Sequence, residues 1–300
     1  MTLQDKINRL KNLMYVRPQR PAVDFLELDF GGAVDELIYK KRGGLFLNLY
    51  SSEELLDLFC EMEINDKISE CGFSNIKMKI SGENSFDHRL RLYSEWDGKD
   101  VLLMELVVKE GIFEPKKTFI EDFSFRNVRM LMIEWLSLQN PNAKFEKNRP
   151  RLPGQKFPGL GILMDLERVL VCICERLGYE GVVDVPEYFH GALMYSPKFF
   201  FYDPEMEGKL RAMMRDLKDI PLATASTAVL LNCVINEVTG EYVDWSPGEQ
   251  ILPISREIED YFKSDGYRDL VLRAEMENSF AVDNGKLEME LESEVNKFLI

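Results

Sequence analysis

The spacing of apolar residues changes once along this chain, and that change limits the folds open to it. Between residues 74 and 139, segments such as NIKMKI, HRLRLYSEW and DVLLMELVVKE have the period-two pattern or apolar density of strands. From Ile162 the spacing becomes that of a helix with one buried face, and Gly178 ends it. Asp97-Gly98 favours a tight hairpin between two of the strands. The sequence therefore predicts antiparallel strands that lead into a strand–helix–strand crossover.

Flanking segments extend this order on both sides. The stretch 51–73 begins with serine capping signals and predicts helix, and GGLFLNLY before it predicts a short strand. After the crossover, GVVDV predicts a strand, EYFHGALMY a helix, KFFFY a strand and PEMEGKLRAMMRDLK a helix. We expect an α/β (α+β) fold in which helices flank a mixed sheet. Its parts are an N-terminal segment over 1–73, a core over 74–219 and a mostly helical extension over 220–300, in which DWSPGEQILP is interpreted as a loop.

Composition excludes some classes of function. The 300 residues suffice for one sizeable core, and the net charge of −15 argues against a general binder of nucleic acid or anionic membranes. No apolar run approaches the roughly 20 residues of a membrane span, and the N-terminus lacks the apolar core of a signal peptide. Five cysteines, an odd number without disulfide-type spacing, fit a reducing compartment. A cytoplasmic location is the expectation.

One stretch of this acidic chain concentrates positive charge. Between residues 144 and 156 a single glutamate stands among five cations, which are Lys144, Lys147, Arg149, Arg151 and Lys156. The sequence KFPGLG then opens the helix that begins near Gly159. Glycines allow a phosphate to approach the backbone, and a helix N-terminus favours an anion. The pattern indicates an anion site, and a solvated loop before an ordinary helix start is the alternative.

Two nucleotide-binding motifs are excluded at this loop. Gly154 and Gly159 have the spacing of a P-loop, but Leu160-Gly161 follow where Lys-Ser/Thr is required, so the grip on phosphate and Mg²⁺ is missing. The glycines at 159 and 161 also lack the third glycine of a dinucleotide fingerprint, and no acidic residue follows at the usual offset.

The segment resembles the coenzyme-A-binding motif of the GNAT superfamily of acyl-CoA-dependent N-acyltransferases. That motif has Gln or Arg, two residues, Gly, one residue, and Gly or Ala; Lys156, Gly159 and Gly161 take its three specified positions. The later EYFHGALMYSPKFFFYDP is similar to the family's A-x-x-x-Y-x-K-x-G-F ending, with Tyr195 at the tyrosine. Pro197 and Phe199 depart from that ending at its lysine and glycine, and Pro158 removes one backbone N–H from the loop. The resemblance covers roughly residues 74–203.

The resemblance implies a set of site residues. Backbone amides of the motif would hold the donor, and these belong to Lys156, Phe157, Gly159, Leu160, Gly161 and Ile162. Arg149 and Arg151 could reach its phosphates, with plain solvent exposure as the alternative. Tyr195 occupies the position of the family's general-acid tyrosine, and a tyrosine's ordinary pKa of roughly 10 keeps its phenol protonated at neutral pH.

Two further residues are candidates for the base. Glu134 interrupts the apolar strand MLMIEWLSL, where burial would raise the pKa of a carboxyl group, and an edge-facing or paired glutamate is the alternative. His190 lies five residues before Tyr195 on the same helix, and a structural histidine is its alternative; His88 is interpreted as structural. No metal site is expected, since Cys172 and Cys174 point to different sides of a helix.

The implied activity is transfer of an acetyl or other acyl group from acetyl-CoA or another acyl-CoA to a small-molecule or peptide amine by direct attack. The alternative is a GNAT-like protein without catalysis that binds CoA or acts as a scaffold. A donor carried on an acidic acyl carrier protein is a third hypothesis, in which the basic loop is a docking patch. The sequence does not name the acceptor, and it leaves a homodimer open.

Overall fold

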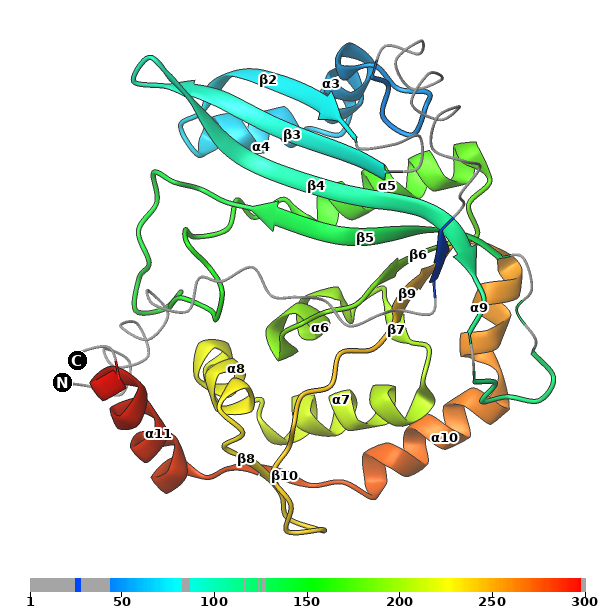
Figure 1. Ribbon diagram of the computed structural model, residues 1–300, viewed down its shortest axis with the longest axis vertical. Coiled ribbons are helices and arrows are strands. Elements are labelled where there is room, and N and C mark those ends of the chain that lie inside the picture. Colours follow the sequence, from blue (N-terminus) through cyan, green and yellow to red (C-terminus); the bar gives the residue numbers. More distant parts are fainter. Residues whose placement is uncertain are drawn as a thin grey trace.

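The computed structural model describes residues 25–27, 44–82, 87–115, 117–123, 125 and 128–297 (Figure 1). The strands are β1 (Phe25–Glu27), β2 (Ser74–Ser81), β3 (Asp87–Trp96), β4 (Lys99–Phe113), β5 (Val128–Leu138), β6 (Gly181–Asp184), β7 (Phe200–Phe201), β8 (Val234–Asn236), β9 (Gln250–Pro253) and β10 (Phe280–Val282). The helices are α3 (Ser52–Glu61), α4 (Ile64–Glu70), α5 (Leu163–Leu177), α6 (Phe189–Tyr195), α7 (Pro204–Asp216), α8 (Leu222–Leu230), α9 (Arg256–Lys263), α10 (Asp265–Met276) and α11 (Asn284–Lys297).

A mixed sheet forms the centre of the described chain. Its strands lie in the order β2-β3-β4-β5-β6-β9-β7, and β1 pairs with the end of β4. The pairs from β2 to β5 are antiparallel, β5 and β6 are parallel, and β9 is antiparallel to both β6 and β7. An antiparallel meander that leads into a parallel crossover is therefore confirmed. The α/β class is confirmed with it, and the architecture is consistent with a GNAT-like fold.

The hairpin between β3 and β4 forms where the sequence predicts it. Asp97 and Gly98 form the turn between the paired residues Trp96 and Lys99, and both have positive φ, at 50° and 72°. Two left-handed residues match the twist of the flanking strands, and aspartate followed by glycine is a pair that tolerates this conformation. The local dipeptide alone therefore determines this turn.

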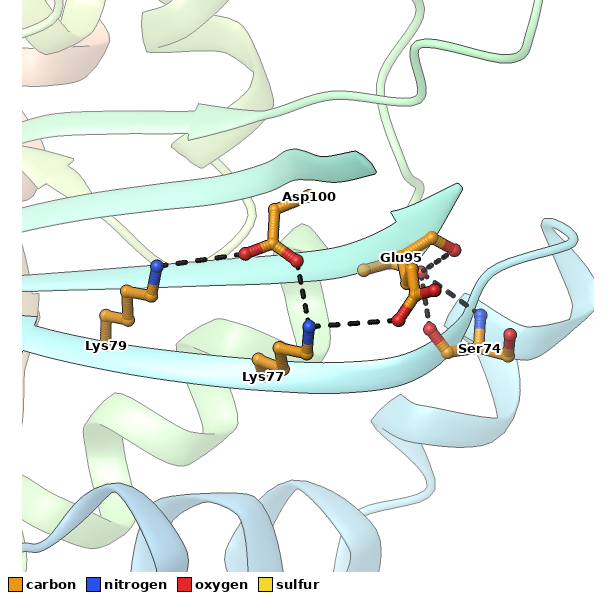
Figure 2. Close-up of polar contacts among 6 residues, drawn as sticks. Ser74, Lys77, Lys79, Glu95 and Asp100 are labelled. Atoms are coloured by element: carbon orange, nitrogen blue, oxygen red, sulfur yellow. Dashed lines mark hydrogen bonds and ion pairs between the residues drawn. The ribbon is translucent and has the colours of Figure 1, made fainter. Parts of the chain in front are cut away.

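Charged side chains of β2, β3 and β4 pair with one another near the β3–β4 turn (Figure 2). Lys77 Nζ lies 2.9 Å from the Asp100 carboxylate and 3.9 Å from that of Glu95. Lys79 Nζ lies 3.9 Å from the other Asp100 oxygen. Lysines on an outer strand discourage pairing with another chain, and the two carboxylates offset their charge. The hydrogen bond from Lys77 lowers the pKa of Asp100, and Coulombic attraction to Lys77 and Lys79 adds to this effect.

This arrangement predicts an acid titration. We expect the Asp100 carboxyl to titrate below its ordinary pKa of 3.8. The Asp100 pKa is lower in the folded state than in the unfolded state. The ionised carboxylate therefore stabilises the fold at pH values above its unfolded-state pKa, and this stabilisation is lost as the pH falls through its folded-state pKa. Lys77→Gln should return the midpoint toward 3.8, and Lys79→Gln should move it less, because that contact is longer. NMR titration of the carboxyl carbon measures both, and identical midpoints in wild type and Lys77→Gln would contradict the assignment.

Helices cover both faces of the sheet. On one face, α3, α4 and α5 pack through Leu55, Ile68 and Leu166 against sheet residues such as Leu92 and Val182. On the other face, α9 and α10 contribute to an aromatic cluster that lies against the sheet; its members include Tyr261, Tyr267, Phe113, Met130 and Val183. A third cluster joins α6, α7, α8 and α11. Side chains of β6 alternate between the two faces, so this strand is covered on both sides, as expected of a parallel strand.

One expectation for the N-terminal part is wrong, and a second holds only in part. The described part of GGLFLNLY, from Gly44 to Tyr50, is not a strand but contains a tight turn closed by a single bridge between Phe46 and Tyr50. Leu47 and Asn48 have φ of 51° and 57° there, and the Leu47 N–H donates to the buried His88 Nδ1 at 3.1 Å. A contact from β3, distant in sequence, thus holds a conformation that apolar spacing does not predict. The helix over 51–73 is also divided, because Glu63 has a φ of 58° between α3 and α4.

The C-terminal segment contributes to the main sheet. Strand β9 pairs with β6 through Val182↔Leu252 and with β7 through Phe200↔Ile251, so it lies between two strands of the predicted core. The sequence DWSPGEQILP, interpreted as a loop, therefore contains the whole of the largely buried strand β9 at its end. The expectation of a helical extension is confirmed for α8 to α11, and β8 pairs with β10 in a small separate sheet. The division into 1–73, 74–219 and 220–300 stays a prediction.

Candidate functional site

The candidate site lies where β5 and β6 stop pairing (Figure 1). Their parallel register runs from Met130↔Gly181 to Ile133↔Asp184, whereas β5 continues to Leu138 against β4 alone among the described strands. The chain then crosses the loop 139–162 and enters α5, which returns it to β6. Ligands of open α/β sheets bind beyond the carboxyl ends of such strands, where neighbouring connections diverge. The basic loop and the glycines are therefore placed at this end of the sheet.

The loop has its own internal support. Leu152 and Gln155 close a turn through an N–H···O bond of 3.2 Å, and Gly154 within it has a φ of 72°. The Arg151 side chain donates to the carbonyl of Gln155 and, at 3.2 Å, to that of Lys156. Arg151 is 8% exposed, and burial lowers its pKa. The structure therefore uses this guanidinium to hold the loop.

The start of α5 is open. Ile162 is its N-cap residue and makes no side-chain cap, so the first-turn N–H groups have no such partner. Gly161 has a φ of 79°, and a Cβ built there would meet nothing within 4 Å. Gly159 approaches the Leu138 carbonyl, with 3.7 Å from its built Cβ, while Leu160 and Ile162 are buried. Exposed glycine backbone and an uncapped helix N-terminus are what an anion site requires.

The other predicted loop residues are exposed or half-buried. Lys156 Nζ lies 5.3 Å from the centre of the half-buried Phe157 ring, and the Arg149 side chain is exposed. The Arg149 N–H donates to the Glu146 carbonyl at 3.1 Å. These two cations remain accessible to a ligand phosphate, unlike Arg151.

Two buried carboxylates stand near the same helix start. Asp165 accepts from Lys67 of α4 at 2.6 Å and from Arg168 at 3.3 Å. A Glu167 carboxylate oxygen lies 3.1 Å from the Nζ of Lys198, a residue of the segment between α6 and β7. Burial raises the pKa of Glu167, and the hydrogen bond from Lys198 opposes that rise. Each carboxylate pairs with a lysine from another element, so the two ion pairs join α5 to its neighbours. The lysines also offset the negative charge of the two carboxylates, which reduces the repulsion that an anion at Gly161 would meet.

The structure gives the three catalytic candidates different partners. Tyr195 ends α6 and is buried beneath α5, with its ring centre 5.0 Å from that of Phe199. His190 is buried on the same helix, and its Nδ1 lies 2.8 Å from Ser226 Oγ of α8. Glu134 follows the last residue paired with β6; its side chain is 30% exposed and lies 3.1 Å from Lys109 Nζ. Their catalytic roles stay predictions.

His88 belongs to a separate buried network. Its Nε2 lies 2.9 Å from a Glu110 oxygen, and the Tyr179 hydroxyl donates to the other oxygen of that carboxylate. Because Nδ1 accepts the Leu47 N–H, the proton of a neutral ring lies on Nε2 and points to Glu110. These bonds tie the turn at 46–50 to β3 and β4, a structural role as expected from the sequence.

Several contacts at the site were not found by sequence reasoning. The Tyr188 ring packs on Gly154, and Lys198 pairs with Glu167. Neither pair has a spacing or motif that signals it, because the partners lie on different elements. No helix in the described ranges is long and apolar enough to cross a membrane, and the His, Cys, Asp and Glu side chains of these ranges form no group of three that could hold a metal ion.

No protein-family model matches the chain, and no curated protein matches it. Among solved structures it is similar to one described as the crystal structure of AtaTR bound with AcCoA, with 14% sequence identity and a TM-score of 0.28. That alignment covers 55% of this chain and 84% of the other.

Proposed function

We propose that the protein binds an acyl-CoA at the start of α5 and transfers the acyl group to a small-molecule or peptide amine. The observation that carries the proposal is the end of β5–β6 pairing at Ile133↔Asp184, followed by a basic glycine loop and an uncapped helix. Extended backbone, cations and bare glycine thus follow one another along the chain, and these are the kinds of group that suit the amides and the phosphates of coenzyme A.

Each part of the donor has a matching group. The exposed backbone at Gly159 and Gly161 and the first-turn N–H groups of α5 suit the pyrophosphate, with Lys156 and Arg149 beside them. The pantetheine arm is extended and carries amide groups, and it would run along the end of the sheet where β5 and β6 stop pairing. Arg151 supports the loop from within rather than contacting the donor.

The chemistry needs a base and an acid. The amine, freed of its proton, attacks the thioester carbonyl, and the tetrahedral intermediate collapses with the thiolate as leaving group. In this proposal Glu134 accepts the ammonium proton through water, and Tyr195 protonates the thiolate. The second proton that the nitrogen loses as the amide forms then returns to the Tyr195 phenolate. His190 is bonded to Ser226 and buried, so we place it in a supporting role.

Gly161→Asp tests the binding half of the proposal. An aspartate there places negative charge beside the pyrophosphate, so calorimetry should show the Kd for acetyl-CoA rising at least about tenfold. Gly240→Asp is the matched control, because Gly240 has a similar φ of 75° and equally open space in a distant loop. No binding by wild type, or equal binding by Gly161→Asp, would refute the site. Binding without transfer to any amine of a broad panel would refute the transferase and leave a CoA-binding protein.

A further inference from the structure

A column of side chains joins the loop before α5 to the C-terminal extension. Tyr188, the residue before α6, lies against Gly154: a Cβ built on that glycine would stand 3.2 Å from both Cε2 and the hydroxyl of the tyrosine. The Tyr188 ring stacks on His190 with 5.3 Å between ring centres and 23° between planes. His190 Nδ1 then meets Ser226 Oγ of α8 at 2.8 Å. We call Gly154, Tyr188, His190 and Ser226 the Tyr188 column.

The loop end of the column depends on a bare backbone. Gly154 combines a left-handed φ with the close approach of an aromatic ring, so a side chain there meets backbone strain and a tight contact with Tyr188. The turn around it is fixed by the Leu152–Gln155 hydrogen bonds and by Arg151. The turn thus behaves as one small unit, and Tyr188 is where this unit meets α6.

The other end of the column is anchored in a dry environment. Ser226 is 1% exposed, and its helix α8 packs against α6 (Figure 1). Its neighbours Ala225 and Ala228 belong to the same apolar cluster as Phe189 and Ala192 of α6. A hydrogen bond in such surroundings orients its partners firmly, because no water replaces it when it breaks. The bond to Ser226 therefore fixes the angle of the His190 ring, on which Tyr188 stacks.

We propose that Tyr188, His190 and Ser226 are positioning residues. Through them the C-terminal extension holds the loop 139–162 in the conformation that binds the acyl-CoA. This inference rests on the proposed function, in which the loop contacts the donor. A loop held in place loses less conformational freedom on binding. The column therefore sets the affinity for the donor and leaves the chemical step alone.

Ser226→Ala is the central test, with Thr227→Val as its matched control. The control also removes one buried hydroxyl from α8, but the Thr227 hydroxyl donates to Ala223 of the same helix. Loss of one buried hydrogen bond corresponds to about a fivefold change. In Ser226→Ala we expect the Kd and KM for acetyl-CoA to rise about fivefold with an unchanged kcat. Hydrogen exchange at the Leu152 and Gln155 amides should become faster by the same factor. Thr227→Val should match wild type in each.

The ring variants separate stacking from other effects. Tyr188→Phe keeps the ring and should retain wild-type affinity, whereas Tyr188→Leu should weaken donor binding as Ser226→Ala does. Unchanged affinity and loop exchange in both Ser226→Ala and Tyr188→Leu would overturn the inference. So would His190→Gln with a lower kcat, a shifted acid limb of the pH profile and an unchanged KM, since that result makes His190 the base.

Hydrogen exchange on the ligand-free protein keeps this test separate from the proposed function. If the wild type binds no acetyl-CoA, the proposed donor site is refuted. Hydrogen exchange at the loop amides still measures whether the Tyr188 column holds the loop. Faster exchange at Leu152 and Gln155 in Ser226→Ala but not in Thr227→Val would then support the link between α8 and the loop. Equal exchange in the two variants would overturn it.

Discussion

Tyr195→Phe is expected to lower kcat for acyl transfer about 100-fold, with little change in the Kd for acetyl-CoA. The substitution removes only the phenolic hydroxyl, which in our proposal protonates the departing thiolate. The ring should stay in place, because it packs against Phe199 in the core beneath α5. Steady-state kinetics with an identified amine, together with calorimetry of donor binding, measure the two quantities.

Tyr202→Phe is the control for this substitution. Tyr202 is also buried, but it lies in the aromatic cluster on the opposite face, and its hydroxyl donates to the Lys117 carbonyl at 2.9 Å. Its loss should cost about 1 kcal/mol of stability and leave kcat unchanged. Wild-type turnover by Tyr195→Phe would remove Tyr195 from the mechanism, and an equal fall in both variants would indicate a general structural effect.

Gly208→Ala is expected to destabilise the fold by about 3 kcal/mol. Gly208 lies in α7 where this helix crosses α10, and a Cβ built there would stand 2.5 Å from both the Ala274 Cβ and the Val271 carbonyl oxygen. Neither atom belongs to the end of a flexible side chain, so the helices must move apart. The urea midpoint should fall with an unchanged slope.

A second helical glycine shows that the effect is one of space. At Gly191 in α6 the built Cβ would stand 3.4 Å from the nearest atom, the Pro186 Cβ. Alanine favours a helix over glycine by up to about 1 kcal/mol. Gly191→Ala should therefore be neutral or stabilising. Equal losses at both positions would contradict the close crossing of α7 and α10.

The elements that the sequence predicts well are those decided by neighbouring residues. The β3–β4 turn follows from Asp97-Gly98, and the end of α5 follows from Gly178, which has a φ of 71°. The start of α7 follows from Asp203-Pro204, since the aspartate accepts the Glu205 N–H at 2.8 Å and proline suits the first helical position. In each case the signal and the structure lie within a few residues.

The candidate site was only partly predictable for the same reason. Gly159 and Gly161 act through their own backbone, which lacks a side chain whatever the rest of the fold. The exposed loop and the open helix start could therefore be expected from the sequence. Charge alone could not distinguish Arg149, which is exposed, from Arg151, which is bound to the loop carbonyls. Composition could not show that Glu134 pairs with Lys109, because the pairing depends on the register of β4 and β5.

By itself the sequence determined the class of fold, the hairpin, the crossover helix and the place of the basic glycine loop, because short-range spacing and turn chemistry specify these features. Only the tertiary structure decided that β9 enters the sheet between β6 and β7, and that Tyr188, His190 and Ser226 stand in one column. Strand pairing and side-chain contacts join residues tens of positions apart. Their formation depends on which surfaces the whole chain brings together, and no local pattern records that choice.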